Sequence, residues 1–168
     1  MRIKYGSTRL VLIVGDRALK IGRFRPLRML WRLVFLLPFS RKKREHFLAK
    51  YGKSFGRAVL NDVFAGLYAN RGEYAYYQTH KDIRVMPTLK SVCGGWIVIQ
   101  PYGDPVSAIE VENWWGRNKA KSPANDPYLA EPEHFQQPEN FRRHPINGKV
   151  VLADYGSTRN REVLALAL

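Results

Sequence analysis

The stretch Gln137-Pro-Glu-Asn-Phe-Arg-Arg-His-Pro-Ile-Asn-Gly-Lys-Val-Val-Leu-Ala-Asp-Tyr-Gly156 decides the expected fold. Within it, Asn147-Gly148 is a strong turn signal, because both residue types tolerate the positive φ of a tight two-residue hairpin turn. The apolar run 150–153 that follows predicts a strand buried on both faces. The hairpin would bring Asn140 and Asp154 to one end, where an amide and a carboxylate can grip a divalent metal on nucleotide phosphates.

This arrangement resembles the metal-binding end of the protein kinase-like fold, in which an asparagine precedes a hairpin and an Asp-Phe-Gly motif follows it. Asp154-Tyr155-Gly156 stands in the place of that motif, and Asn140 in the place of the second metal ligand. The chain is most similar to small bacterial kinase-like proteins, including the lipopolysaccharide-core kinases. The resemblance implies an α+β, two-lobe protein of bacterial or phage origin, with an antiparallel-sheet N-lobe over 1–103 and a strongly reduced C-lobe over 104–168.

Earlier segments follow the kinase-like order. Two strands joined by Gly15-Asp16 are expected near the N-terminus, and the second strand would carry Lys20, which the resemblance assigns to the α- and β-phosphates of ATP. A helix over 58–82 would carry Glu73, the expected partner of that lysine. The resemblance therefore implies a buried lysine–glutamate pair behind the nucleotide.

Two further strands are expected over 83–103, and they would lead into a hinge at 100–103 that contacts adenine. The expected catalytic residues are Lys20, Glu73 and Asp154. The expected ligands of ATP and Mg²⁺ are Lys20, Gln100, Tyr102, Asn140 and Asp154, with the metal on Asn140 and Asp154.

Two departures from the family pattern leave the activity open. The stretch His134-Phe-Gln-Gln-Pro-Glu-Asn140 stands where the catalytic loop belongs, but it is one position shorter than the pattern and contains no aspartate. That aspartate accepts the proton of the attacking hydroxyl in kinases. Residues 5–8 also offer one glycine where a phosphate-covering loop has three. With so short a C-lobe, a membrane-associated or glycolipid acceptor is favoured over a protein acceptor.

The net charge of +14 is unevenly distributed. Residues 20–57 hold twelve Lys and Arg but one acid, whereas residues 104–139 hold seven acids and three bases. This asymmetry predicts a basic face that binds an anionic partner, with a membrane surface or phosphoglycolipid favoured over a nucleic acid. The single cysteine, Cys93, excludes an internal disulfide, and no Cys/His spacing suggests zinc.

The bases concentrate in an insertion over 26–57, where an apolar helix flanked by arginines precedes a cluster of four bases. The apolar run 33–37 is much too short to span a bilayer, and Pro38 would stop the helix. Such a segment suits the interface of an anionic membrane. It could instead pack on the small lobe with its charges in solvent. The candidate contacts with an anionic partner are Arg28, Arg32, Arg41, Lys42, Lys43 and Arg44.

Residues 1–6 lack the apolar region of a signal peptide, so a cytoplasmic location, peripheral at the inner membrane, is expected. Three functions stay open on the sequence. The first is a minimal kinase-like domain that binds Mg-ATP and transfers its γ-phosphoryl group. The second is an inactive pseudokinase that binds a partner through the 26–57 surface. The third is a nucleic-acid-binding protein, which only the charge supports.

Overall fold

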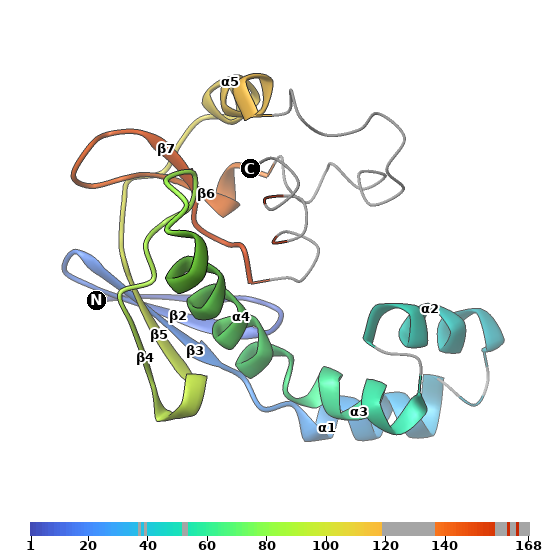
Figure 1. Ribbon diagram of the computed structural model, residues 1–168. Coiled ribbons are helices and arrows are strands. Elements are labelled where there is room, and N and C mark those ends of the chain that lie inside the picture. Colours follow the sequence, from blue (N-terminus) through green and yellow to red (C-terminus); the bar gives the residue numbers. More distant parts are fainter. Residues whose placement is uncertain are drawn as a thin grey trace.

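The computed structural model describes residues 1–36, 38, 40–51, 54–118, 137–156, 161 and 164. It confirms the expected α+β class, with a five-stranded antiparallel sheet, a separate two-stranded hairpin and several helices (Figure 1). The large sheet has the order β1-β2-β3-β5-β4. Its strands are β1 (Arg2–Tyr5), β2 (Arg9–Val14), β3 (Arg17–Gly22), β4 (Lys90–Val92) and β5 (Ile97–Pro101). The helices are α1 (Pro26–Trp31), α2 (Arg41–Tyr51), α3 (Phe55–Val63), α4 (Ala65–His80) and α5 (Ala108–Asn118), with a π-helical turn η1 (Arg32–Leu36) and 3₁₀ turns η2 (Cys93–Gly95) and η5 (Pro138–Asn140).

The β2–β3 hairpin sets which side chains face the interior. Its turn is Gly15-Asp16, as predicted, and Gly15 adopts a φ of +58° that suits glycine. The register pairs Val11 with Lys20 and Arg9 with Gly22. Because opposed residues in a sheet share a face, Arg9 and Lys20 point the same way, toward helix α4, which contacts β3.

The opposite face of the sheet is apolar and remains open to solvent at several positions. Ile3, Tyr5 and Val14 are 45%, 77% and 49% exposed. Other apolar side chains on this face are only partly buried, namely Leu10, Leu12, Leu19, Ile21, Ile97 and Ile99. The functional groups therefore gather on the α4 side of the sheet.

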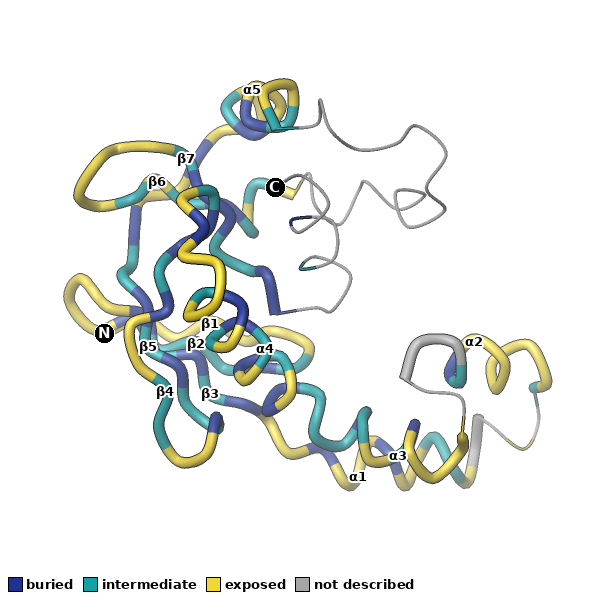
Figure 2. The backbone as a smooth tube through the Cα atoms, viewed as in Figure 1, coloured by how far each residue is buried: buried dark blue, intermediate teal, exposed yellow. Residues whose placement is uncertain are grey.

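Residues 26–63, as far as they are described, form an arm of α1, η1, α2 and α3 that extends away from the sheet (Figures 1 and 2). The expected helix before Pro38 is present as α1 continued by η1, and Pro38 lies in a turn. The arm has its own small core around Met29, Phe47 and Ala58. Among the described helices, none has both the length and the apolar character that crossing a membrane requires.

The prediction of a single helix over 58–82 is wrong, because the helix is interrupted at Phe64 and forms two helices, α3 and α4. The backbone of Phe64 is not helical (φ −101°, ψ 17°), and its ring lies 5.3 Å from Phe24 and 6.2 Å from Trp96. Directly after the break, Gly66 lies so close to the sheet that a Cβ atom there would be 2.3 Å from the carbonyl oxygen of Thr8. The break lets α4 begin against the sheet.

The predicted hairpin near the C-terminus is confirmed as β6 (Phe141–Arg143) and β7 (Val150–Leu152). Its turn is longer than the predicted two residues. Gly148 has a φ of +67°, but Asn147 does not take the positive φ of a two-residue turn. Instead, the Asn147 side-chain oxygen accepts a 3.0 Å hydrogen bond from the backbone N–H of Lys149, which is ordinary asparagine turn chemistry.

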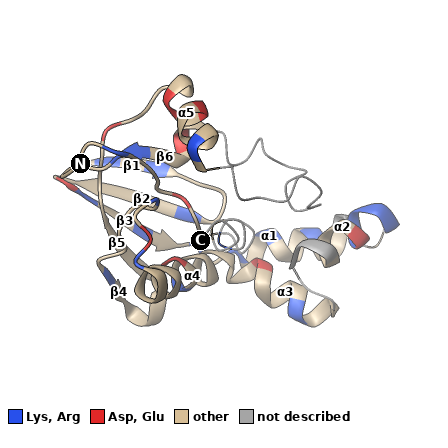
Figure 3. Cartoon of the chain, turned by 45° about the horizontal axis from the view of Figure 1, so that its top comes forward, with Lys and Arg blue, Asp and Glu red and all other residues tan. Residues whose placement is uncertain are grey.

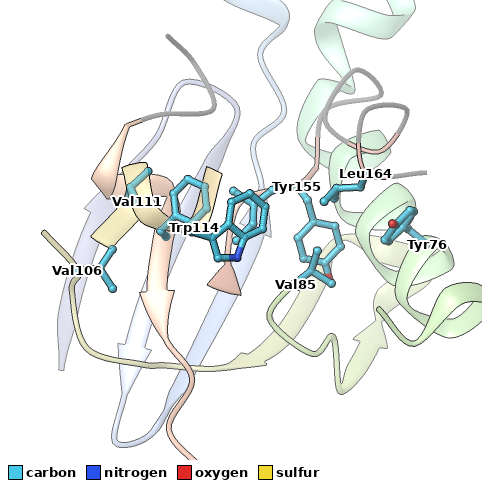
Figure 4. Packing of buried hydrophobic residues seen from close by; sticks show 9 residues of the cluster. Tyr76, Val85, Val106, Val111, Trp114, Tyr155 and Leu164 are labelled. Carbon is cyan, nitrogen blue, oxygen red and sulfur yellow. The ribbon is translucent and has the colours of Figure 1, made fainter. Parts of the chain in front are cut away.

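The main hydrophobic core joins parts of the chain from both sides of residue 103 (Figure 4). Tyr76 of α4 and Val85 pack with residues of α5 and the hairpin, and Val85 also forms a parallel bridge with Leu152. The rings of Trp114 and Phe141 are 5.0 Å apart. The segments 1–103 and 104–168 therefore share this core.

Candidate functional site

Lys20 of β3 and Glu73 of α4 meet in the interior between sheet and helix. The Lys20 Nζ atom donates hydrogen bonds of 3.1 and 3.0 Å to the two carboxylate oxygens of Glu73. The Glu73 side chain is fully buried, and that of Lys20 is 8% exposed. The structure thus brings together the two residues that the sequence predicted to pair.

Asp154 reaches the same place from the hairpin. The Lys20 Nζ atom also donates a 2.5 Å hydrogen bond to the carbonyl oxygen of Ala153, the residue before Asp154. The backbone N–H groups of Ala153 and Asp154 donate to the carbonyl oxygen of Asn140 at 2.7 and 3.1 Å. Asn140 and Asp154 therefore lie side by side at the base of the hairpin, and the Asp154 side chain is half exposed.

Arg9 is the residue of this site that the sequence analysis missed. Its Nη1 atom lies 2.7 Å from a Glu73 carboxylate oxygen, and its Nη2 atom forms an ion pair with Asp154. The Arg9 side chain is only 7% exposed. We call Arg9, Lys20, Glu73 and Asp154 the charged cluster; its two cations and two carboxylates balance in formal charge.

The electrostatics of the charged cluster show strong coupling. Partial burial would by itself raise the pKa of Asp154, but the charges of Arg9 and Lys20 hold it at about 2. Burial lowers the pKa of Lys20 by more than Glu73 raises it, and the charge of Arg9 lowers it further. Burial also opposes the charge of Arg9, yet Asp154 and Glu73 raise its pKa. Asp154 and Arg9 therefore stay charged at neutral pH.

A series of hydrogen bonds connects the charged cluster to buried polar residues. Gln100 is buried, and its side-chain N–H group donates to Glu73 at 3.3 Å and to the Thr88 hydroxyl at 3.1 Å. The Tyr155 hydroxyl lies 2.6 Å from the Thr88 hydroxyl and donates to the carbonyl oxygen of Met86 at 2.9 Å. Gln100 therefore points into the cluster, which does not suit the adenine contact expected from the sequence.

The other expected hinge residue lies apart from the cluster. The backbone N–H of Tyr102 donates to the carbonyl oxygen of Asp16 at 2.7 Å, and its half-buried ring lies 6.0 Å from the Arg142 guanidinium carbon. Tyr102 thus stands between the β2–β3 turn and the C-terminal hairpin.

The glycine of Asp154-Tyr155-Gly156 is required by close packing. A Cβ atom at Gly156 would lie 2.9 Å from the Arg9 Nη1 atom and 3.0 Å from a carboxylate oxygen of Glu73. The pentapeptide Tyr-Gly-Ser-Thr-Arg occurs at 5–9 and again at 155–159. The arginine of the first copy thus contacts the glycine of the second, although residues 157–160 lie outside the described part of the chain.

The donor set does not fit a tightly held Mg²⁺ ion. Magnesium requires near-octahedral oxygen ligands, and here the Asp154 carboxylate already binds Arg9. Within the described residues, no group of three or more His, Cys, Asp or Glu could hold a metal. His134, in the stretch that stands in the place of the catalytic loop, falls outside the described residues.

The residues expected to meet an anionic partner divide by exposure into two sets; Figure 3 marks Lys and Arg positions in blue. Arg28 and the bases 41–44 are exposed on α1 and α2. Arg32 is mostly buried, and its guanidinium donates to Asp62 at 2.8 Å, so it helps to hold the arm together. Among the side chains of α1 and η1 whose exposure is described, the exposed apolar ones are Leu27, Leu30, Trp31 and Val34, at 80%, 57%, 53% and 49% exposure.

Comparison of the chain with protein-family models, curated proteins and solved structures found no match.

Proposed function

We propose that this chain is a reduced, two-lobe kinase-like domain that binds the phosphates of a nucleotide, ATP in the first instance, at the charged cluster. One observation carries the proposal: a lysine on β3 pairs with a glutamate on the helix behind the sheet, beside an aspartate that follows a hairpin. These groups come from three distant parts of the chain. Kinase-like nucleotide sites use the same residue types in the same chain order.

Each residue then has a distinct task. Lys20 would attract the α- and β-phosphates, and Glu73 would hold the lysine in position. Gln100 fixes Glu73 through its 3.3 Å hydrogen bond, so its task is to position the pair. Tyr102, at the end of β5, remains the candidate for a contact with adenine.

The sequence favours nucleotide binding without catalysis over transfer of the phosphoryl group. The segment 134–140 contains no aspartate to accept the proton of an attacking hydroxyl. A pseudokinase, which binds a nucleotide without turning it over, accounts for both the retained cluster and the missing base. Phosphoryl transfer to a membrane-associated or glycolipid acceptor is the alternative within the same fold.

The test is ATP binding measured by calorimetry, both with magnesium and with a chelator. The parent chain and Lys90→Met are expected to bind alike, because Lys90 is an exposed lysine on β4. Lys20→Met is expected to lose at least tenfold in affinity, because it removes the phosphate-binding charge. If the parent binds no nucleotide in either buffer, the proposed function is wrong.

A second observation favours docking of the arm on an anionic membrane. The exposed apolar residues 27, 30, 31 and 34 follow the i, i+3, i+4, i+7 spacing of one helix face. The exposed bases 41–44 belong to the same arm, and Figure 3 shows blue residues grouped on α2. An apolar helix face beside a group of bases is suited to the interface of an anionic leaflet.

Flotation with vesicles tests this role. The parent is expected to float with vesicles that contain anionic phospholipid, and to float less as salt rises, because each base near the surface adds about 1 kcal/mol. Leu30→Asp should remove flotation, whereas Ile83→Asp, at another apolar residue that is 81% exposed, should not. Retention of the parent by nucleic acid but not by anionic vesicles would contradict the membrane role.

A further inference from the structure

We infer that Arg9 takes the place of magnesium in this site, so that nucleotide phosphates bind the charged cluster without a divalent cation. This inference rests on the proposed nucleotide binding, and it specifies that the ligand is the nucleotide free of magnesium. It departs from the Mg²⁺ expected from the sequence resemblance.

Arg9 lies where a kinase-like site holds its metal. In a kinase-like site the aspartate after the hairpin holds a metal ion that faces the phosphates. Here the Nη2 atom of Arg9 forms an ion pair with an Asp154 carboxylate oxygen, so a guanidinium stands where the aspartate would meet its metal. The Nη1 atom continues to Glu73 at 2.7 Å, which links the two carboxylates through one cation.

The formal charge of the cluster also disfavours a divalent cation. Without Arg9, the cluster would consist of Lys20, Glu73 and Asp154 and would carry one net negative charge, which attracts a divalent cation. With Arg9 the formal charge is zero, and two buried cations lie within the same cluster. A further cation bound to Asp154 would lie next to the Arg9 guanidinium, and the two like charges would repel because the Arg9 side chain is only 7% exposed and little screened by solvent.

The Arg9 side chain is held in place by its neighbours. Its guanidinium also donates to the Asn70 side chain at 3.3 Å, and Asn70 donates in turn to the carbonyl oxygens of Lys20 and Trp96 at 2.9 and 3.0 Å. The chain just before Arg9 is held as well, because Arg23 donates to the carbonyl of Gly6 at 3.1 Å and Arg25 to that of Ser7 at 2.8 Å. An incoming ion would have to dismantle this network to displace Arg9.

The guanidinium also has the chemistry to replace a metal on phosphates. Arginine carries five N–H donors in a planar fork that suits phosphate oxygens, and its charge persists at any physiological pH. The described acceptors of Arg9 are Asn70, Glu73 and Asp154. This number is smaller than the number of donors, so a phosphate oxygen at the Asp154 side can share the guanidinium.

The experiment compares ATP affinity of the full chain in a chelating buffer and in excess magnesium. Equal or tighter binding in the chelator is expected, because free ATP carries more negative charge than its magnesium complex and meets two cations. Arg9→Gln is expected to lose at least tenfold in the chelator and to gain affinity when magnesium is added, because Asp154 is then released. Arg17→Gln, at an exposed arginine of the same β2–β3 hairpin whose described ion pair is with Asp16, should behave as the parent.

The outcomes separate the two proposals. Parent binding that rises tenfold or more with magnesium would overturn the role of Arg9 while leaving nucleotide binding in place. Absence of binding in both buffers would overturn nucleotide binding itself, and the role of Arg9 with it. The parent comparison needs no variant, so it decides the matter even if Arg9→Gln does not fold. Water-proton relaxation with Mn²⁺ provides a second readout: no enhancement is expected with the parent, and enhancement is expected with Arg9→Gln.

Discussion

Glu73→Gln is expected to be the most destabilising single substitution in the charged cluster. The Glu73 side chain is fully buried and binds Lys20 at 3.0 Å and Arg9 at 2.7 Å. Glutamine keeps the shape but removes the charge, so two buried cations would share Asp154 as their one remaining counter-charge. Breaking a buried ion pair from one side typically costs about 3–5 kcal/mol.

Deprotonation of Lys20 sets an independent upper limit on this loss of folding free energy. Rather than stay charged without Glu73, the lysine can lose its proton, which for an ordinary lysine at pH 7 costs about 4.6 kcal/mol. The loss should therefore not exceed this value by much. It should also shrink as the pH rises from about 7 to about 10, because the unfolded chain then binds more protons than the folded variant.

Urea unfolding followed by circular dichroism measures the effect as a shift in the midpoint at constant slope. Glu112→Gln, on the exposed side of α5, is the matched control and should change stability by less than about 0.5 kcal/mol. The double variant Lys20→Met with Glu73→Gln restores charge balance and should lose less than the sum of the two single variants, by about 1–3 kcal/mol. A loss under about 1 kcal/mol for Glu73→Gln would refute the reasoning that these charges depend on one another.

Three further outcomes follow from the same site and its surroundings. Gly156→Ala should destabilise by about 1–3 kcal/mol because its methyl group would press on Arg9 and Glu73, whereas Gly116→Ala, in open space on α5, should stabilise by about 0.5–1 kcal/mol; thermal unfolding of the pair measures the contrast. Tyr155→Phe should cost about 1–3 kcal/mol, since Met86 and Thr88 lose a buried hydrogen-bond partner, and an unchanged urea midpoint would contradict this. The pKa of Asp154, about 2 in the folded chain, lies below its ordinary value, so its ionised form stabilises the fold at neutral pH; the stability gap between parent and Asp154→Asn should close as pH falls from about 5 to about 2.

The local elements could be predicted because short-range patterns specify them. Gly15-Asp16 between two apolar runs predicted the β2–β3 hairpin, and the pattern of segment 137–156 predicted the hairpin that leads into Asp154. The longer turn near Asn147 was not predicted because Asn-Gly fits turns of two lengths. In the structure, backbone hydrogen bonds from His144 to Lys149 and from Gly148 to His144 close the longer turn.

The tertiary features could not be read from such patterns. The helix break at Phe64 depends on how closely Gly66 approaches Thr8, a contact between segments more than fifty residues apart. Arg9 escaped for the same reason, although strand alternation places it on the face of Lys20 once the register is known. Gln100 could have been placed correctly, because residues two apart on a strand share a face and Val98 of β5 is buried, whereas the kinase-like pattern assigns position 100 to the hinge.

The contact between Arg9 and Asp154 joins residues that are 145 positions apart. The strands over 2–22 can pair early because their partners are close along the chain, and Glu73 then balances one of the two cations, Arg9 and Lys20, but Asp154 is synthesised much later. Until then the inner face of the sheet carries one uncompensated positive charge, which must remain hydrated. Water can be excluded from that face only when the hairpin that carries Asp154 has been synthesised and docks. Cooperative folding of the whole chain therefore also requires this hairpin.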